Sequence, residues 1–169
     1  MHVRLPKLSR RLSVAVVLAI VLVAAGITFY LVRRAQAVPI PRAVTEAVTF
    51  PIFLPKELPA GYKLDEQSFK YVAGEQVLVF QATDPAGDTL VFSQQAKPGN
   101  VNFSEFAQKQ LINAKKLPNT PYPTTVGKTL DRQTTLVSTI TDKTWIIMTT
   151  QVELDNQQLH RLAASFRER

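Results

Sequence analysis

The sequence predicts an α+β protein in which an N-terminal single transmembrane helix precedes an antiparallel sheet of five to six strands with two helices on one face. Three observations lead to this fold class. A run of 19 uncharged residues lies near the N-terminus, later segments alternate apolar and polar residues, and two segments carry apolar residues at helical spacing. The chain has 169 residues, 46% hydrophobic and 20% charged, which is the composition of a folded protein.

The uncharged run covers residues 14–32 and predicts the transmembrane helix. At about 1.5 Å per residue, a helix of this length spans about 28 Å, close to the hydrocarbon thickness of a bilayer. A charge at the bilayer centre costs at least about 2.5 kcal/mol. We therefore expect the lipid bilayer to hold this segment, with four flanking arginines at its boundaries: Arg10, Arg11, Arg33 and Arg34.

Basic residues flank this segment unequally. The tail of residues 1–13 contains four of them and no acid, whereas two follow the segment directly. This excess predicts a single-pass protein of the cell membrane, with a cytoplasmic N-terminus and an extracytoplasmic C-terminal domain. Cleavage of a signal peptide after Ala37 is the alternative, because small residues stand at positions 35 and 37. The apolar run is, however, longer than the roughly 7–15 residues of a signal peptide.

Prolines separate the membrane segment from the rest of the chain. Proline lacks a backbone donor and disfavours helix in the residue before it, so residues 33–50 are expected to form an extended linker. The domain then comprises residues 51–169. Its first part, residues 51–59, is too apolar for a free linker and is expected to cover one edge of the folded domain.

Alternation of apolar and polar residues predicts the strands of the sheet. Residues 76–84 show it most clearly, with Leu78, Phe80 and Ala82 on one face. Turn residues at 73–74 and 84–88 separate this segment from its neighbours. The expected strands are residues 62–71, 76–84, 88–96, 124–130, 134–141 and 144–152.

Helical spacing predicts two helices, over residues 103–113 and 156–167. Asn102 or Ser104 would cap the first, and Asp155 would cap the second. The second helix carries a stripe of apolar residues suited to a sheet: Leu159, Leu162, Ala163 and Phe166. Residues 117–123 are proline-rich and are expected to form a loop.

Composition argues against several classes of function. The chain has no cysteine, which excludes disulfides and thiolate metal sites, and its two histidines, His2 and His160, are too far apart to suggest a metal centre. Six of the 20 basic residues and none of the 13 acids fall in residues 1–34, so the remainder is nearly neutral and is not expected to bind nucleic acid. Motif searches give no catalytic, cofactor-binding or metal-binding residues.

Two motifs resemble a family of bacterial extracytoplasmic domains. One is the entry motif of Leu58, Pro59, Gly61 and Tyr62; the other is the closing helix with Leu159, Leu162, Ala163, Ala164, Ser165 and Phe166. Such domains are often tethered by one transmembrane helix or fused to anti-sigma regulators. They are similar in outline to periplasmic lipoprotein-carrier and sigma-regulator domains. The resemblance implies a sheet-and-helix domain without an assigned enzymatic function.

Together these features predict a non-enzymatic membrane protein that presents a binding or sensing domain in the cell envelope. Its ligand would be an envelope protein, peptide, glycan or lipid. The alternative is a carrier of a lipid or another hydrophobic ligand, in an apolar cavity lined by Phe80, Phe92, Trp145 and Phe166. A third hypothesis is a hydrolase that uses carboxylates such as Glu75, Asp84 or Asp131.

Overall fold

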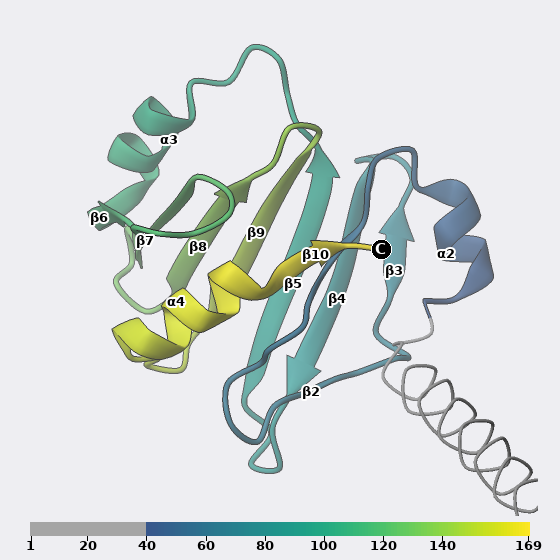
Figure 1. Ribbon diagram of the computed structural model, residues 1–169, viewed down its shortest axis with the longest axis horizontal. Coiled ribbons are helices and arrows are strands. Elements are labelled where there is room, and N and C mark those ends of the chain that lie inside the picture. The colour runs from purple at the N-terminus through teal and green to yellow at the C-terminus, as the bar shows by residue number, and fades with distance from the viewer. Residues whose placement is uncertain (1–39) are drawn as a thin grey trace, which may run out of the picture. The chain divides into compact units, whose positions relative to one another are not determined.

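The main sheet is antiparallel, and seven of its eight strands follow the order β2-β4-β5-β9-β8-β7-β6, with the short strand β3 also paired to β4 (Figure 1). The computed structural model describes residues 40–169. The strands of the main sheet are β2 (Lys63–Leu64), β3 (Lys70–Val72), β4 (Val77–Thr83), β5 (Thr89–Ala96), β6 (Leu111–Lys116), β7 (Thr124–Thr129), β8 (Thr135–Ile140) and β9 (Thr144–Thr150).

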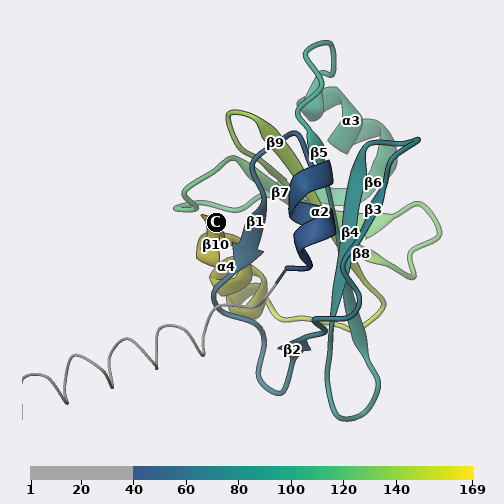
Figure 2. The ribbon, with the colours of Figure 1, turned by 90° about the vertical axis from the view of Figure 1, so that its right-hand side faces the viewer.

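Three helices and a second, two-stranded sheet complete the described part of the chain. The helices are α2 (Arg42–Ala47), α3 (Phe103–Gln110) and α4 (Asn156–Ser165). In the second sheet, β1 (Phe53–Pro55) pairs antiparallel with β10 (Phe166–Glu168). This pairing joins segments from the two ends of the described chain (Figure 2).

One face of the main sheet, which we call the inner face, forms the core. The register aligns Phe80, Phe92 and Met148 across β4, β5 and β9, so that their side chains share this face. Each is at most 1% exposed. The rings of Phe69, Phe80 and Phe92 stack in succession at centroid distances of 4.8 and 4.9 Å, and Phe166 meets Phe92 edge-on.

Helix α4 and the two-stranded sheet cover the inner face. The apolar stripe of α4 is buried, with Leu162 and Ala163 each 1% exposed. Asp155 begins this helix through a capping box, in which its carboxylate accepts from Gln158 N and the Gln158 side chain accepts from Asp155 N. The segment of residues 50–58, which we call the N-terminal strap, also lies here. It is held by Gln94 at Phe53 and by the Thr144 hydroxyl, which donates to Pro51 O at 2.7 Å.

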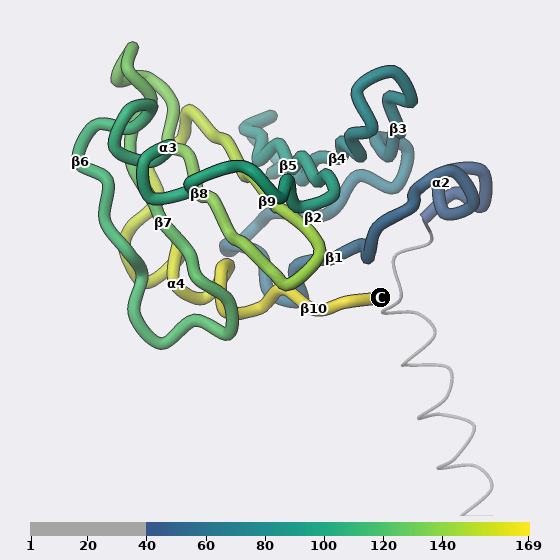
Figure 3. Tube along the Cα trace, turned by 90° about the horizontal axis from the view of Figure 1, so that it is seen from above, coloured from purple at the N-terminus to yellow at the C-terminus, as the bar shows by residue number. Residues whose placement is uncertain are grey.

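Helix α3 packs on the opposite, outer face. Phe103 and Phe106 approach the ring of Trp145 edge-on at centroid distances of 5.2 and 5.1 Å. The indole N–H of Trp145 donates to Ser138 Oγ at 2.8 Å. Figure 3 shows α3 and α4 on opposite sides of β7 and β8.

These observations correct the predicted fold class of α+β with five to six strands and two helices on one face. The described residues form ten strands and three helices, and the two predicted helices lie on opposite faces. The predicted strand 62–71 is divided into the short strands β2 and β3, and β1, β6 and β10 were not predicted. Strands β1 and β10 have three residues each, too few to show alternation. The strap crosses the inner face and does not cover an edge of the domain.

Two further segments differ from their predictions. The first predicted helix ends at Gln110, because Leu111 is extended and pairs with Thr129 to begin β6. Residues 42–47, within the predicted extended linker, form α2, which starts directly after Pro41. Proline is well tolerated at such a helix start, since no donor is needed there.

The membrane prediction concerns another part of the chain. Among residues 40–169, no helix combines the length and apolar character needed to cross a membrane. The predicted segment 14–32, its boundary arginines Arg10, Arg11, Arg33 and Arg34, and the cleavage site at Ala37 all lie outside the described residues.

Candidate functional site

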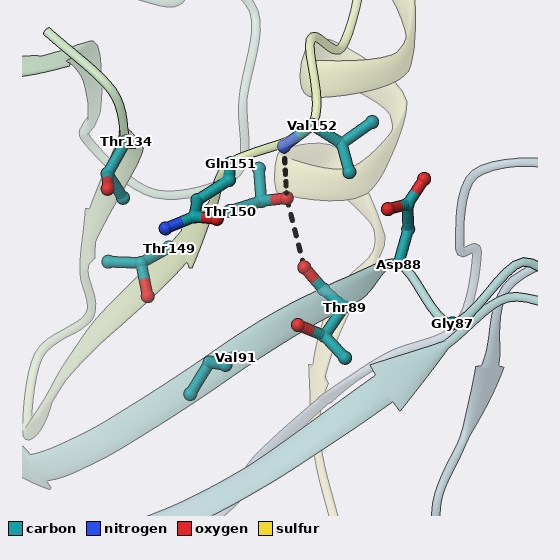
Figure 4. Close-up of a pocket in the computed structure, with 9 residues that line it drawn as sticks. All are labelled: Gly87, Asp88, Thr89, Val91, Thr134, Thr149, Thr150, Gln151 and Val152. Carbon is teal, nitrogen blue, oxygen red and sulfur yellow. Dashed lines mark hydrogen bonds between the residues drawn. The ribbon is translucent and has the colours of Figure 1, made fainter.

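A pocket of about 410 Å³ opens where β5 begins and β9 ends, and we call it the β5–β9 pocket (Figure 4). Four segments contribute to it: the turn between β4 and β5, the first residues of β5, the residue before β8, and the end of β9 with the bend that follows. The lining residues are Gly87, Asp88, Thr89, Val91, Thr134, Thr149, Thr150, Gln151 and Val152.

The turn between β4 and β5 fixes one wall of the pocket. Asp84 Oδ1 accepts hydrogen bonds from Ala86 N and Asp88 N, both at 2.9 Å. Gly87 has φ +91°, a conformation that side-chain-bearing residues rarely adopt. The carboxylate of Asp84 and the left-handed conformation of Gly87 thus shape the turn, and the turn places Asp88 at the edge of the pocket.

Pairing between β5 and β9 builds the floor. Val91 is the partner of Thr149, so both side chains lie on the outer face. Thr150 points the other way: its hydroxyl donates to Thr89 O at 3.0 Å and accepts from Val152 N at 3.1 Å (Figure 4). These two bonds fix the bend after β9, which places Gln151 at the pocket.

Most polar side chains of the pocket are unpaired within the protein. Of the six lining residues with polar side chains, Thr150 uses its hydroxyl in the bonds just described. Within residues 40–169, the other five make no hydrogen bond or ion pair through their side chains: Asp88, Thr89, Thr134, Thr149 and Gln151. Their hydrogen-bonding capacity is therefore available to water or to a ligand.

The hydroxyl of a half-buried tyrosine lies close enough to this turn to be influenced by its two aspartates. The hydroxyl of Tyr62 is buried and has no hydrogen-bond partner among the described residues. Burial raises the pKa of this phenol above its usual 10.0, and the negative charges of Asp84 and Asp88 raise it further. Tyr62 therefore stays neutral at physiological pH and keeps a hydroxyl proton close to the two aspartates.

Of the four aromatic residues predicted to line an apolar cavity, three pack against one another and the fourth lies on the other face of the sheet. Phe80, Phe92 and Phe166 belong to the packed inner face, where each is at most 1% exposed. Trp145 lies on the outer face beneath α3. None of the four lines the β5–β9 pocket.

The other titratable residues considered from the sequence are also dispersed. Asp84 binds the backbone of its own turn, and Asp131 accepts from the Thr129 hydroxyl and from Gln133 N. His160 bonds to Pro118 O at 2.8 Å and so links α4 to the proline-rich loop. Glu75 is exposed in a separate turn. Among residues 40–169, no three His, Asp or Glu side chains cluster as metal ligands would.

Sequence reasoning did not find the β5–β9 pocket. It assigned Asp88 and Gly87 to a turn, and the structure has them there. The threonines give no signal for a pocket, because threonine is common in any half-exposed strand. The pocket forms because β5 pairs with β9, although α3, β6, β7 and β8 lie between them in the sequence. The residues of either strand alone do not indicate this pairing.

Comparisons with models of protein families, with curated proteins and with solved structures found no match to this chain. The resemblance to extracytoplasmic domains associated with anti-sigma regulators therefore stays a prediction.

Proposed function

We propose that this chain is a single-pass membrane protein that displays a ligand-binding domain outside the cell membrane, and that the β5–β9 pocket is its binding site. The observation that carries the proposal is the set of five unpaired polar side chains around one pocket. A pocket of about 410 Å³ lies within the range of about 300–1,000 Å³ that is usual for small-molecule sites.

The chemistry of the pocket favours binding over catalysis. Asp88 is the one titratable side chain among its nine lining residues. Carboxylate hydrolases of the glycosidase type use a pair of carboxyl groups that flank the bond to be cleaved. The nearby Asp84 directs Oδ1 to the backbone of its own turn. We therefore assign the lining groups to recognition.

The membrane attachment rests on the sequence. Residues 14–32 contain no charge, and arginines stand on both sides of them. Such a run is long enough to cross a bilayer as a helix. The greater number of basic residues on its N-terminal side supports an extracytoplasmic position for the domain.

A fragment screen on the full chain in lipid nanodiscs tests the binding site. Small polar fragments are expected to show saturation transfer from the protein by NMR. Thr149→Val and Gln151→Ala should each reduce that transfer severalfold, since each removes an unpaired group from the pocket. Thr125→Val and Gln157→Ala are matched controls outside the pocket and should leave it unchanged. Fragments that bind equally well to all four variants would contradict the assignment.

Cysteine labelling tests the orientation, because the natural chain has no cysteine. Leu130 is 62% exposed at the turn between β7 and β8. In spheroplasts of a bacterial expression host, a membrane-impermeant maleimide should label Leu130→Cys. It should label Ser9→Cys, in the N-terminal tail, only after the membrane is permeabilised. The opposite pattern would place the domain in the cytoplasm and overturn this part of the proposal.

A further inference from the structure

We infer that the β5–β9 pocket binds a neutral saccharide, an inference that rests on the function proposed above and specifies its ligand. Charge is the first argument. No lysine or arginine is among the lining residues, so a phosphate, sulfate or carboxylate group would find no countercharge there. Asp88 would repel such a group. A cationic ligand would gain little, because an exposed ion pair is typically worth about 0–1 kcal/mol.

The hydrogen-bonding groups provide the second argument. Each threonine hydroxyl donates one hydrogen bond and accepts others, the Gln151 carboxamide donates and accepts, and the Asp88 carboxylate accepts through two oxygens. A sugar hydroxyl likewise donates and accepts, and two adjacent hydroxyls can donate to both carboxylate oxygens. An apolar ligand would instead leave these groups desolvated without partners, at a cost of about 1–3 kcal/mol for each.

The position of the pocket argues against an extended peptide. A peptide that adds to a sheet pairs with the free backbone edge of an outer strand. At the pocket, β5 lies between β4 and β9, and β9 lies between β5 and β8, so neither strand has a free edge. A ligand in this pocket therefore has to be recognised by side chains. A sugar suits this mode of recognition, because its hydroxyl groups point outward from a compact ring.

The apolar part of the pocket fits the same ligand class. Val91 is half-buried in the floor, and Val152 lies at the bend after β9. Each of these two side chains offers a small apolar surface to the C–H groups of a sugar ring. Figure 4 shows the two valines apart, with the polar side chains of Thr89, Thr150 and Gln151 between them.

Saturation-transfer NMR on the full chain in nanodiscs tests this inference with defined probes. The neutral probes are maltotriose, cellotriose, mannotriose and triacetylchitotriose, and trigalacturonic acid is the anionic comparison. At least one neutral probe is expected to bind with a dissociation constant at or below the millimolar range, and trigalacturonic acid is expected not to bind. Thr149→Val should weaken that binding at least fivefold, whereas Thr125→Val should not change it.

The outcomes distinguish an error in the ligand class from an error in the proposed binding site. If no neutral saccharide binds but polar fragments still lose binding in Thr149→Val, the ligand class is wrong and the binding site stands. If neither saccharides nor fragments respond to substitutions in the pocket, both are wrong. Preferential binding of trigalacturonic acid would likewise overturn the charge argument.

Discussion

The carboxamide of Gln94 bonds to both backbone polar groups of Phe53: Oε1 accepts from Phe53 N at 2.9 Å, and Nε2 donates to Phe53 O at 2.5 Å. Gln94 is 0% exposed on the inner face of β5. Its side chain thus occupies the place of a neighbouring strand along one edge of β1, while β10 pairs with the other edge. Together with the bond from the Thr144 hydroxyl to Pro51 O, this glutamine attaches the N-terminal strap to the main sheet.

Substitution of Gln94 by leucine should destabilise the fold. The variant leaves two buried backbone groups of Phe53 without partners, each at about 1–3 kcal/mol, so we expect the free energy of unfolding to fall by about 2–6 kcal/mol. Urea unfolding followed by the fluorescence of Trp145, the single tryptophan, measures it. Gln95→Leu is the matched control, half-buried on the outer face, and should change stability by less than about 1 kcal/mol. Equal effects of the two substitutions would contradict the role of Gln94.

Gly127→Ala should destabilise the sheet by overpacking. A Cβ at this position would lie 2.9 Å from Leu111 Cβ and 3.1 Å from Ile112 O, and the latter is a backbone atom of β6 that cannot move alone. We expect a loss of about 1–3 kcal/mol in the free energy of unfolding. Gly74→Ala, where nothing lies within 4 Å, should be neutral or slightly stabilising. Thermal unfolding of both variants provides the comparison, and a neutral Gly127→Ala would show that β6 can shift away from β7.

Asp155→Ala should weaken α4 at its first turn. The substitution removes the carboxylate that accepts from Gln158 N at 2.7 Å, and loss of such a cap costs about 0.5–2 kcal/mol. Glu153→Ala, two residues earlier and exposed, serves as the control and should have little effect. Hydrogen exchange should then be faster in the first turn of α4 than in the parent chain; unchanged exchange there would mean that packing alone holds the turn.

Hydrogen bonds to the Asp131 carboxylate make the stability of the fold depend on pH in acidic solution. The hydrogen bond from the Thr129 hydroxyl, and a further one from Gln133 N, hold the pKa of this carboxyl below its usual 3.8. A lowered pKa in the folded state means that the carboxylate stabilises the fold above about pH 3.8. This contribution disappears as the pH falls through the lower pKa of the folded state.

Two measurements check this pH dependence. The stability difference between the parent chain and Asp131→Asn should be constant near neutral pH and should shrink below about pH 3.8. Carboxyl NMR should show the pKa of Asp131 moving up toward 3.8 in Thr129→Val and staying low in Thr125→Val, whose hydroxyl lies elsewhere on β7. An unchanged pKa in Thr129→Val would show that this hydrogen bond does not set it.

The sequence predicted those parts of the fold whose stabilising contacts are local and periodic. Leu78, Phe80 and Ala82 alternate with partly exposed residues, and β4 forms there. The capping residues Asn102 and Asp155 begin the two predicted helices. In these elements, burial of one face selects the structure from residues close together in the chain.

The rest depends on partners that are distant in the chain. Strand β10 contains Arg167 and Glu168, which give no strand pattern; it forms because β1 pairs with it and because Phe166 inserts beside Phe92. Strand β6 contains a bulge between Ile112 and Lys115, where Asn113 has φ +55°, and its first residues were assigned to the preceding helix. The pocket was missed for the same reason, since Val91 and Thr149 become partners only when β5 pairs with β9.

The pairing of Phe53 with Glu168 also sets an order of events during synthesis. A ribosome makes residue 53 more than a hundred residues before its partner emerges, and closing so long a segment is slow. Until β10 is made, β1 lacks its strand partner, and the two-stranded sheet that covers part of the inner face is incomplete. Chaperones that bind nascent polypeptides would therefore find exposed apolar surface on this chain until β10 has been synthesised.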